Sequence, residues 1–426
     1  MSNQDNQKPL YFHQLQVKGV NSFVSQQTLN LTNTDGSTAM FTVVLGNNNT
    51  GKTTLLRCLA GMAPVIKIEE DDGKKYNRCI ANFNNYVYQH NFLFFHQGDS
   101  NYSNNIRLNS SLLGVFLDYR RDFGIIGMSE TKGHYESEQI KATKVDGYGT
   151  QRKQGKGSYV EYELKDRTET LFKDETDSII NAEEWFLGTD YDALKGNKQA
   201  KRNLNQIKDA LISLLPDIED ILVGEEKRRV YFVNKKGDKI LVSQLGSGYQ
   251  SLVTWVVDYA KRLFDRYPDS DNPLAEPGIV LVDEIDLHLH PDWQRKIVSF
   301  LRGKFPKTQF IVTAHSPLVV QSAENINVAI LNYDEDKKEV AISQPPITNY
   351  QGWTVEEILS ELMGMGDKVM SDKYLELIAQ FDKGLDNANF ELAKEAYEEL
   401  EKIVKSSGQL KLLRLQMAAL TPLQHD

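Results

Sequence analysis

Residues 46–53 have the composition and spacing of a loop that binds phosphate groups. They read Gly46-Asn47-Asn48-Asn49-Thr50-Gly51-Lys52-Thr53, followed by Thr54, and match G-x-x-x-x-G-K-[ST] in full. Such a loop turns backbone N–H groups toward phosphate oxygens, and the helix that follows adds partial positive charge. We predict that Lys52 neutralises the outer phosphates and that the Thr53 hydroxyl binds Mg²⁺. A plain turn between a strand and a helix is the alternative interpretation.

Two adjacent carboxylates follow a second apolar run, Gly278–Val282. We predict that Asp283 holds Mg²⁺ through water and that Glu284 orients and polarises an attacking water. Positioning and electrostatics supply most of the catalysis in phosphoryl transfer, so this pair suits that reaction. Two acidic residues at the end of a strand are more often simply exposed to solvent where the chain leaves the sheet. Their combination with the glycine loop favours the catalytic interpretation.

His315 lies in a third segment, Ile311–Pro317, which again has the pattern of a strand followed by a helix. Ser316 suits the N-cap of that helix and Pro317 its first turn. His315 is thereby left at the carboxyl end of the strand, where α/β sheets bind ligands. A lone histidine is usually structural, but this placement predicts a contact with a γ-phosphate.

A fourth segment, Leu245-Gly246-Ser247-Gly248, precedes a predicted helix and is similar to the Leu-Ser-Gly-Gly-Gln signature of ABC-type ATPases. The four motifs in this order resemble that family. The resemblance implies ATP as ligand, Mg²⁺ as cofactor and ATPase activity. It also implies a homodimer or higher oligomer, because two heads of that family enclose two ATP molecules between them.

The signature departs from the family pattern in two places. Gly246 stands where the family has serine, with Ser247 one position later, and Tyr249 replaces the usual glutamine. We therefore expect slow hydrolysis, or a function in which ATP binding dominates. Gln89 and Gln97 are both candidates for the glutamine loop of the family.

The residues after the carboxylate pair narrow the resemblance. Asp283–Pro291 reads Asp-Glu-Ile-Asp-Leu-His-Leu-His-Pro, a form seen in RecF-like and overcoming-lysogenization-like ATPases. A metal site at His288 and His290 is the less favoured interpretation, because no further ligands are apparent. Sustained heptads are missing before the signature, which argues against a long coiled coil. The chain after His315 is expected to be too short for an added Toprim nuclease.

This layout resembles the ATPase subunits of bacterial anti-phage systems of the Septu and retron type, which work with a separate HNH nuclease. The resemblance implies a sensor or regulator of such a nuclease. The alternative is a RecF-like DNA repair or chromosome-maintenance ATPase. DNA contacts would then come from two groups of basic residues. The simpler explanation of both groups is that they are charged residues of solvent-exposed loops. The first group is Lys141, Lys144, Arg152, Lys153 and Lys156, and the second is the run Lys227-Arg228-Arg229.

The elements that must position the motifs alternate between strand and helix. Strands are predicted at 41–45, 278–282 and 309–313, and helices after Gly51 and at 250–264, 291–305 and 317–322. This alternation predicts an α/β fold with a mixed, largely parallel sheet, which the two α/β blocks can share. A hairpin is expected between Ala329–Asn332 and Glu339–Ile342.

We assign residues 1–61 and 230–345 to one ATPase head. Residues 62–229 are predicted to be an insertion with a helical part and a mobile loop at about 130–158. That loop is rich in glycine and poor in aliphatic residues. Residues 346–426 are predicted to be a helical region for a partner or for oligomerisation. Its stripe of Phe390, Ala393, Tyr397, Leu400 and Val404 is expected to pack within its own domain rather than on a partner.

The composition argues against several further classes of protein. The 426 residues carry 49 Lys and Arg against 59 Asp and Glu, a net charge of -10, and 40% are hydrophobic. These values are ordinary for a globular protein and argue against a histone-like coat on DNA. The two cysteines, Cys58 and Cys79, are too few for a disulfide framework. No apolar run of about 18 residues occurs, so we expect a cytoplasmic protein without a membrane partner.

Overall fold

The structure is a computed structural model of the chain. It describes residues 9, 11–62, 144–152, 167–173, 179–215, 217–224, 229–366, 370–404 and 407–418, together with the backbone of five strands between 64 and 126. The chain divides into two units, Met1–Trp353 and Thr354–Asp426. Each unit is described by itself.

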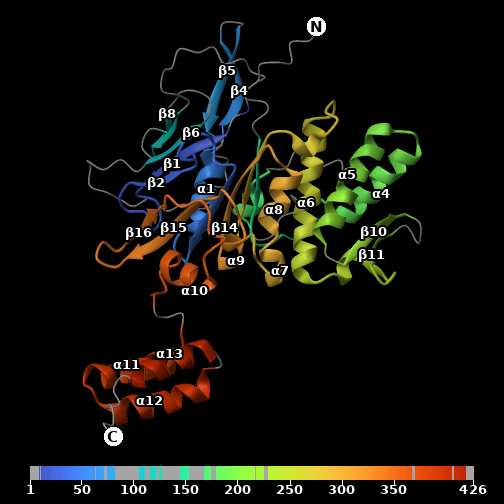
Figure 1. Ribbon diagram of the computed structural model, residues 1–426. Helices are drawn as coiled ribbons and strands as arrows, with labels where there is room; N and C mark the ends of the chain where they lie inside the picture. Colours follow the sequence, from blue (N-terminus) through green and yellow to red (C-terminus); the bar gives the residue numbers. More distant parts are fainter. Residues whose placement is uncertain are drawn as a thin grey trace. The chain divides into compact units, whose positions relative to one another are not determined.

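A six-stranded sheet forms the centre of the first unit, in the order β16-β15-β3-β14-β13-β9 (Figure 1). Neighbouring strands run parallel, except that β16 runs antiparallel to β15. The strands are β3 (Phe41–Gly46), β9 (Val145–Tyr148), β13 (Gly278–Val282), β14 (Thr308–Ala314), β15 (Asn327–Asp334) and β16 (Glu339–Ser343). The α/β fold with a mixed, largely parallel sheet is thereby confirmed. Both α/β blocks share this sheet, because β3 pairs with β15 and β14.

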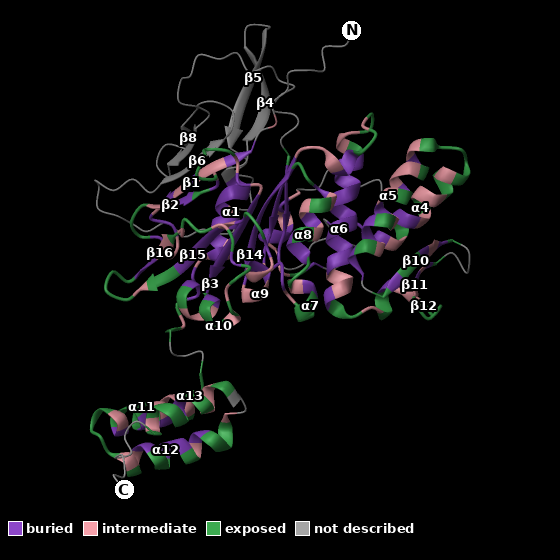
Figure 2. Cartoon of the chain, in the orientation of Figure 1, coloured by how far each residue is buried: buried purple, intermediate pink, exposed green. Residues whose placement is uncertain are grey.

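The parallel register brings three carboxyl ends to one edge of the sheet. Val312 of β14 pairs with Val43 of β3 on one side and with Val282 of β13 on the other. Residues that follow these strands therefore emerge side by side. All residues of β3, β13 and β14 are buried, which fits a sheet covered on both faces (Figure 2).

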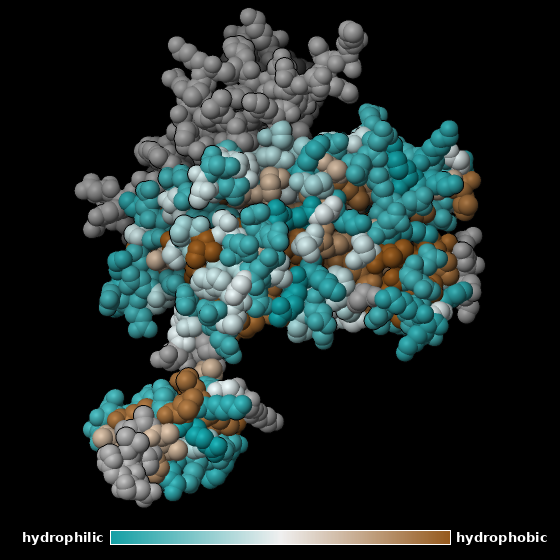
Figure 3. Space-filling view, viewed as in Figure 1, coloured by the Kyte–Doolittle hydropathy of each residue, from teal (hydrophilic) through white to brown (hydrophobic). Residues whose placement is uncertain are grey.

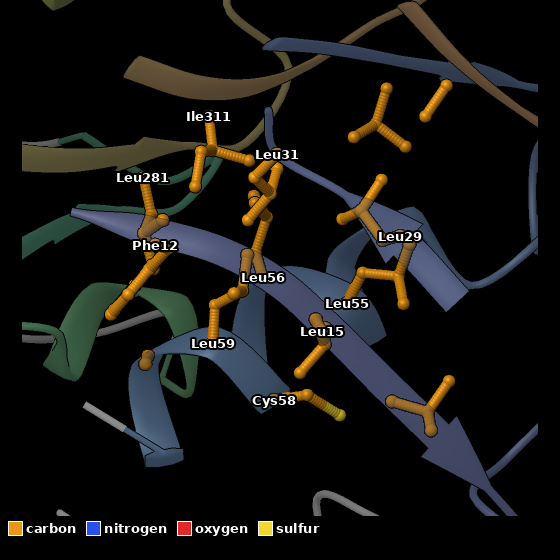
Figure 4. Packing of buried hydrophobic residues seen from close by; sticks show 14 of the residues in the cluster. Phe12, Leu15, Leu29, Leu31, Leu55, Leu56, Cys58, Leu59, Leu281 and Ile311 are labelled. Carbon is orange, nitrogen blue, oxygen red and sulfur yellow. The ribbon is translucent and has the colours of Figure 1, made fainter. Parts of the chain in front are cut away.

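Helix α1 (Lys52–Met62) packs between the central sheet and a second, antiparallel sheet. Leu55, Leu56 and Leu59 of α1 lie in one buried cluster with residues of both sheets (Figure 4). Burial of each leucine contributes about 1.5–3 kcal/mol, so this cluster fixes the helix that begins at the glycine loop. The antiparallel sheet has the order β2-β1-β6-β7-β8 and consists of β1 (Phe12–Lys18), β2 (Gln27–Asn30), β6 (Asn105–Ser110), β7 (Phe116–Arg120) and β8 (Gly124–Ile126). A separate hairpin joins β4 (Pro64–Asp71) and β5 (Lys74–Ala81).

The signature segment leads into α6 (Ser247–Arg266), a helix with fourteen buried residues among its twenty (Figure 2). Helices α4 (Ala182–Leu194) and α5 (Lys198–Leu214) contact it, and a small sheet follows in the order β10-β11-β12. Its strands are β10 (Ile218–Val223), β11 (Val230–Asn234) and β12 (Lys239–Leu241). Shorter helices connect the sheet strands: α7 (Pro291–Gln294), α8 (Ile297–Lys304) and α9 (Pro317–Gln321). The single helix predicted over 291–305 is thus two helices.

The prediction that residues 62–229 form an insertion apart from the head needs correction. Strand β6 pairs with β1, and β9 pairs with β13 in the central sheet. The structure also contradicts the mobile loop over its part 144–152, because Val145–Tyr148 are buried; residues 130–143 and 153–158 lie outside the described residues. Composition misled the prediction because β9 has only four residues. Gly147, which has no side chain, packs where a Cβ would lie 2.6 Å from Leu171.

A buried charge cluster holds β9 against α6. The Asp146 carboxylate is fully buried and accepts from Arg262 Nη1 at 3.2 Å and from Arg266 Nη2 at 2.7 Å. Burial by itself would raise the pKa of Asp146, but Arg266, Arg262 and Arg167 hold that pKa below its usual value. Cationic partners that are themselves buried make this an ion cluster whose members depend on one another.

The second unit contains α10 (Val355–Glu357) and three longer helices, α11 (Asp372–Asp386), α12 (Phe390–Ile403) and α13 (Ser407–Ala418). Thr354 and Glu357 form a capping box at the start of α10. The prediction that the stripe on α12 packs within its own domain is confirmed, since Ala393, Tyr397 and Leu400 lie in one buried cluster with α11 residues. The face of the chain in Figure 3 is mostly hydrophilic. Among the described residues, no helix is long and apolar enough to cross a membrane.

Replacing the buried carboxylate tests the cluster. We expect Asp146→Asn to lower the free energy of unfolding of the first unit by about 3–5 kcal/mol, because the buried guanidinium group of Arg266 loses its carboxylate partner, while Arg262 keeps its pair with Asp258. Denaturant unfolding followed by tryptophan fluorescence measures this. Asp271→Asn, at an exposed pair with Arg202, is the control and should leave stability unchanged. Equal stability of both variants would contradict the cluster's role.

Candidate nucleotide-binding and catalytic site

The glycine loop has the backbone geometry that its sequence predicts. It connects the last residue of β3, Gly46, to the first residue of α1, Lys52. Gly51 has φ +88°, and a Cβ there would lie 2.8 Å from Ser22 Oγ and 3.0 Å from the Phe23 ring. Only glycine fits both restrictions at this position. The N–H groups at the start of α1 are therefore available to an anion at the loop.

Lys52 lies inside the loop. Its side chain is buried, and Nζ donates to the carbonyl oxygens of Gly46 and Asn47, both at 2.8 Å. Burial lowers the pKa of Lys52, while the negative charges of Asp283, Glu284 and Asp286 act in the opposite direction. The ammonium thus stands at the loop's centre with neutral partners that a phosphate oxygen can replace.

An open pocket of about 760 Å³ lies over the loop. Its size is in the range of small-molecule sites. Its described lining combines the loop with the ends of two other sheet strands and with a turn near the N-terminus. The lining residues are Asn21, Ser22, Asn48, Asn49, Gly51, Lys52, Thr53, Thr54, Glu284 and His315.

Asp283 connects three elements through its carboxylate. Oδ2 accepts from Thr53 Oγ1 on α1 at 2.6 Å, and Oδ1 accepts from Thr313 Oγ1 on β14 at 2.6 Å. The Thr53 hydroxyl and the Asp283 carboxylate are hard oxygen donors beside the pocket. Mg²⁺ uses one or two such ligands together with waters and phosphate oxygens, so this donor set fits the ion.

Glu284 directs its carboxylate into the pocket from a left-handed backbone conformation with φ 47°. Its N–H donates to Thr313 Oγ1 at 2.7 Å. One carboxylate oxygen, Oε1, lies 3.6 Å from Nε2 of His315, and each of the two side chains is about one third exposed. A carboxylate and an imidazole that share a pocket with Lys52 can act on a phosphate group and on a water beside it.

Hydrogen bonds fix the backbone of the turn that carries His315. The buried Asp286 carboxylate accepts from the backbone N–H of His315 at 3.0 Å and from that of Ser316 at 2.7 Å. Ser316 is the N-cap of α9, as predicted: its hydroxyl accepts from Leu318 N–H at 3.2 Å and donates to Gln294 Oε1 at 2.7 Å. The turn that carries His315 is therefore fixed on both sides.

The signature segment lies elsewhere. Gly246 is the N-cap of α6, Ser247 is its first residue, and Leu245 accepts from the Gln250 side chain at 2.6 Å. Gly248 packs so closely that a Cβ would lie 2.2 Å from the His288 carbonyl oxygen. Of the described residues that line the pocket, none comes from Leu245–Gly248.

Four residues near the site had not been assigned from the sequence. Asn21 and Ser22 line the pocket, and Asn21 Nδ2 donates to Thr54 Oγ1 at 3.0 Å. Thr313 bridges Asp283 and the Glu284 N–H; its position as the last residue of the predicted strand 309–313 was the available signal. Arg152 donates to backbone carbonyls of the carboxylate pair. The turn of Asn21 carries no motif, so nothing in the sequence indicated it.

The glutamine-loop candidates Gln89 and Gln97 lie outside the described residues. Gln151 is exposed and follows β9. This strand pairs with β13, which ends at the site. His290 acts as a cap, since its Nδ1 accepts from Asp292 N–H at the start of α7. Among the described residues, no group of three or more His, Cys, Asp or Glu side chains forms a possible metal site.

The basic residues proposed for DNA contact are only partly within the described chain. Arg152 is buried, which corrects its assignment to a solvated loop. Arg229 pairs with Glu183 at 3.5 Å, and Lys144 is exposed. Lys141, Lys153, Lys156, Lys227 and Arg228 lie outside the described residues.

Comparison with known proteins agrees with this geometry. A family model described as "AAA domain, putative AbiEii toxin, Type IV TA system" matches residues 41–321. The chain is 37% identical over 211 residues to the Septu protein PtuA of Bacillus thuringiensis. The aligned residues cover 48% of this chain and 50% of that protein. This chain is 32% identical over 180 residues to the probable ATPase of retron Ec83 of Escherichia coli, covering 42% of this chain and 32% of that one. The chain thus spans half or less of the curated relatives it matches.

Solved structures with a similar fold include the SMC head domain from Thermotoga maritima, which is 13% identical and covers 79% of this chain and 99% of that one, with a TM-score of 0.38. A second is the SMC head bound to the C-winged helix domain of ScpA, with 11% identity, coverage of 79% and 97%, and a TM-score of 0.44. These scores add nothing to the sheet topology described above. The family match extends from the first residue of β3 to the last of α9 and includes the glycine loop, the carboxylate pair and His315. The chain belongs to this AAA-domain family, and it resembles the Septu protein PtuA and the probable ATPase of retron Ec83.

Proposed function

We propose that the chain binds ATP with Mg²⁺ and hydrolyses it. The observation that supports this most strongly is the shared pocket of Lys52, Thr53, Glu284 and His315, which come from three strands whose carboxyl ends meet at one edge. The arrangement offers a cation for phosphate, oxygen donors for a metal ion and a carboxylate beside them. Phosphoryl transfer depends mainly on these positioning and electrostatic contributions.

In this proposal each residue has one task. The N–H groups of the loop and the Lys52 ammonium bind the phosphate chain, with Lys52 exchanging the carbonyls of Gly46 and Asn47 for phosphate oxygens. Thr53 and Asp283 would hold Mg²⁺, and the ion would supply positive charge beside the phosphates. Glu284 orients and polarises the attacking water, and His315 contacts the γ-phosphate. Thr313 holds the backbone of Glu284 through its N–H.

We further propose that two heads associate around the nucleotide. Of the described residues that line the pocket, none comes from the signature segment, and α6 begins within that segment at Ser247. A second copy can therefore supply Leu245–Gly248 to the open side of the pocket. Because Gly246 lacks the hydroxyl found in the usual signature, we expect slow turnover, with Ser247 as the nearest hydroxyl.

The biological role that we propose is a sensor or regulator of a separate HNH-type nuclease in bacterial defence against phages. The support comes from the relatives, which are a Septu protein and retron ATPases. The region matched by the family model, residues 41–321, contains every residue that is given a task in the nucleotide site above. Control of a partner by nucleotide state would use that site directly.

The first prediction concerns Lys52. We expect Lys52→Ala to weaken ATP binding by roughly 10- to 150-fold, because a charge-assisted hydrogen bond contributes about 1.5–3 kcal/mol. Isothermal titration calorimetry with Mg-ATP measures this. Lys307→Ala is the matched control, since Lys307 precedes β14 at the opposite end of the strand. Normal affinity in Lys52→Ala would contradict the phosphate site.

The second prediction separates binding from chemistry. We expect Glu284→Gln to bind ATP with nearly unchanged affinity and to lose hydrolysis by at least about 100-fold, because the amide no longer polarises the water. Phosphate release in single-turnover experiments measures the rate. Glu276→Gln, which precedes β13 at the far end of the strand, should hydrolyse ATP like the wild type. Hydrolysis at the wild-type rate in Glu284→Gln would remove Glu284 from the mechanism.

The third prediction tests the role. We expect the native locus to reduce phage plating in a sensitive host, and Lys52→Ala to abolish that protection. Affinity purification of the tagged protein from its own host, with mass spectrometry, should recover a nuclease in stoichiometric amount. Protection that is insensitive to Lys52→Ala would contradict the nucleotide-dependent role. Recovery of recombination or replication proteins in place of a nuclease would favour the alternative of DNA repair.

A further inference from the structure

Arg152 is a buried arginine next to the carboxylate pair that the ATPase motifs do not account for. It follows β9, the edge strand beside β13, and its side chain is only 7% exposed. A buried arginine is unusual unless its guanidinium group is satisfied by acceptors. The described contacts of this guanidinium therefore indicate what the residue does.

The guanidinium group holds the backbone on both sides of Glu284. Nη2 donates to the carbonyl oxygen of Asp283 and, at 2.9 Å, to that of Glu284. Nε donates to the carbonyl oxygen of Gly149 at 2.8 Å, and this bond holds the guanidinium group from its other side. Two consecutive carbonyls of the carboxylate pair thus face a single cation.

This contact acts where the backbone is strained. Glu284 has φ 47°, a left-handed conformation that costs a residue with a side chain roughly 1–2 kcal/mol. The conformation directs the Glu284 carboxylate toward the pocket and away from the sheet. The Glu284 N–H donates to Thr313, and the Ile285 N–H donates to the Thr313 carbonyl oxygen at 2.9 Å. Thr313 thus holds the donors of this turn and Arg152 holds its acceptors.

Strand β9, which precedes Arg152, is itself fixed. The Asp283 N–H donates to the Tyr148 carbonyl oxygen at 2.8 Å, and the Tyr148 hydroxyl donates to Asp258 on α6 at 2.7 Å. Asp146 adds the ion cluster with Arg262 and Arg266. The guanidinium group is therefore held at the site by the sheet and by α6, and a long flexible side chain gains a defined position.

We propose that Arg152 is a positioning residue for Glu284, which keeps the strained turn in the conformation that places the catalytic carboxylate over the phosphates. Arg152 does not line the nucleotide pocket and contacts no atom of the carboxylate group among the described hydrogen bonds. It acts on the rate of the chemical step and not on ATP affinity. The inference rests on the proposed ATPase function.

The test is a set of kinetic measurements on the full chain. We expect Arg152→Met, which keeps the length of the apolar stem, to lower kcat by about 100-fold, the order expected for a misplaced catalytic group. The KM and Kd for ATP should stay within about twofold of the wild type. Arg152→Lys should restore part of kcat, because an ammonium can donate to both carbonyls without the fork. Arg302→Met is the matched control, since Arg302 also donates to a backbone carbonyl, that of Glu324.

A double variant distinguishes positioning from a general structural role. In the Glu284→Gln background, Arg152→Met should cause no further loss of the residual single-turnover rate, because its effect passes through Glu284. A full additional loss in the double variant would overturn the proposal. So would an unchanged kcat in Arg152→Met, or a fall in ATP affinity that matches the fall in rate.

Hydrogen exchange gives a readout that does not need ATPase activity. We expect the peptide that contains Glu284 and Ile285 to exchange faster in Arg152→Met than in the wild type and in Arg302→Met, while the remaining peptides of the central sheet exchange alike. Equal exchange in all three proteins would overturn the positioning role. If the wild type neither binds nor hydrolyses ATP, the proposed function fails, and exchange still decides whether Arg152 holds this turn.

Discussion

The Asp283 carboxylate is the interaction on which the rest of the site depends. It accepts hydrogen bonds from Thr53 at the start of α1 and from Thr313 near the end of β14, and it lies at the end of β13 itself. Three elements that are far apart in the sequence are thereby joined by the two oxygen atoms of one carboxylate. The parallel register supplies the geometry, because neighbouring strands that run in the same direction end side by side. The hydrophobic cluster around α1 then keeps the phosphate loop against this edge.

This arrangement explains why the middle of the chain matters to the site. Strand β9 completes the sheet beside β13, and its burial depends on charges supplied by α6. The helix that begins with the signature segment is therefore connected to the carboxylate pair through β9. Movement of α6 would alter the support of β9, and Arg152 lies at the end of that strand. A physical connection between the signature helix and Glu284 follows from contacts alone.

The sequence was sufficient for the parts of the fold that follow local rules. The glycine loop, the apolar runs of β3, β13 and β14, and the Ser316-Pro317 helix start each combine a short pattern with a physical requirement at the same position. Parallel pairing then had few alternatives, because buried strands of this kind need helices on both faces. The boundaries were less certain, as the division of 291–305 into α7 and α8 shows.

Strand β9 and its contacts could not be predicted for a different reason. Four residues that include an aspartate and a glycine carry no periodic signal, and two of the arginines that neutralise Asp146, Arg262 and Arg266, lie more than one hundred positions away on α6. The same holds for Arg152, whose acceptors are backbone carbonyls and so leave no mark in the pattern of side chains. A motif identifies the residues that would meet the nucleotide. The residues that hold those motifs in place are determined by tertiary contacts, and in this chain two of them, Asp146 and Arg152, come from the segment that was predicted to be a loop.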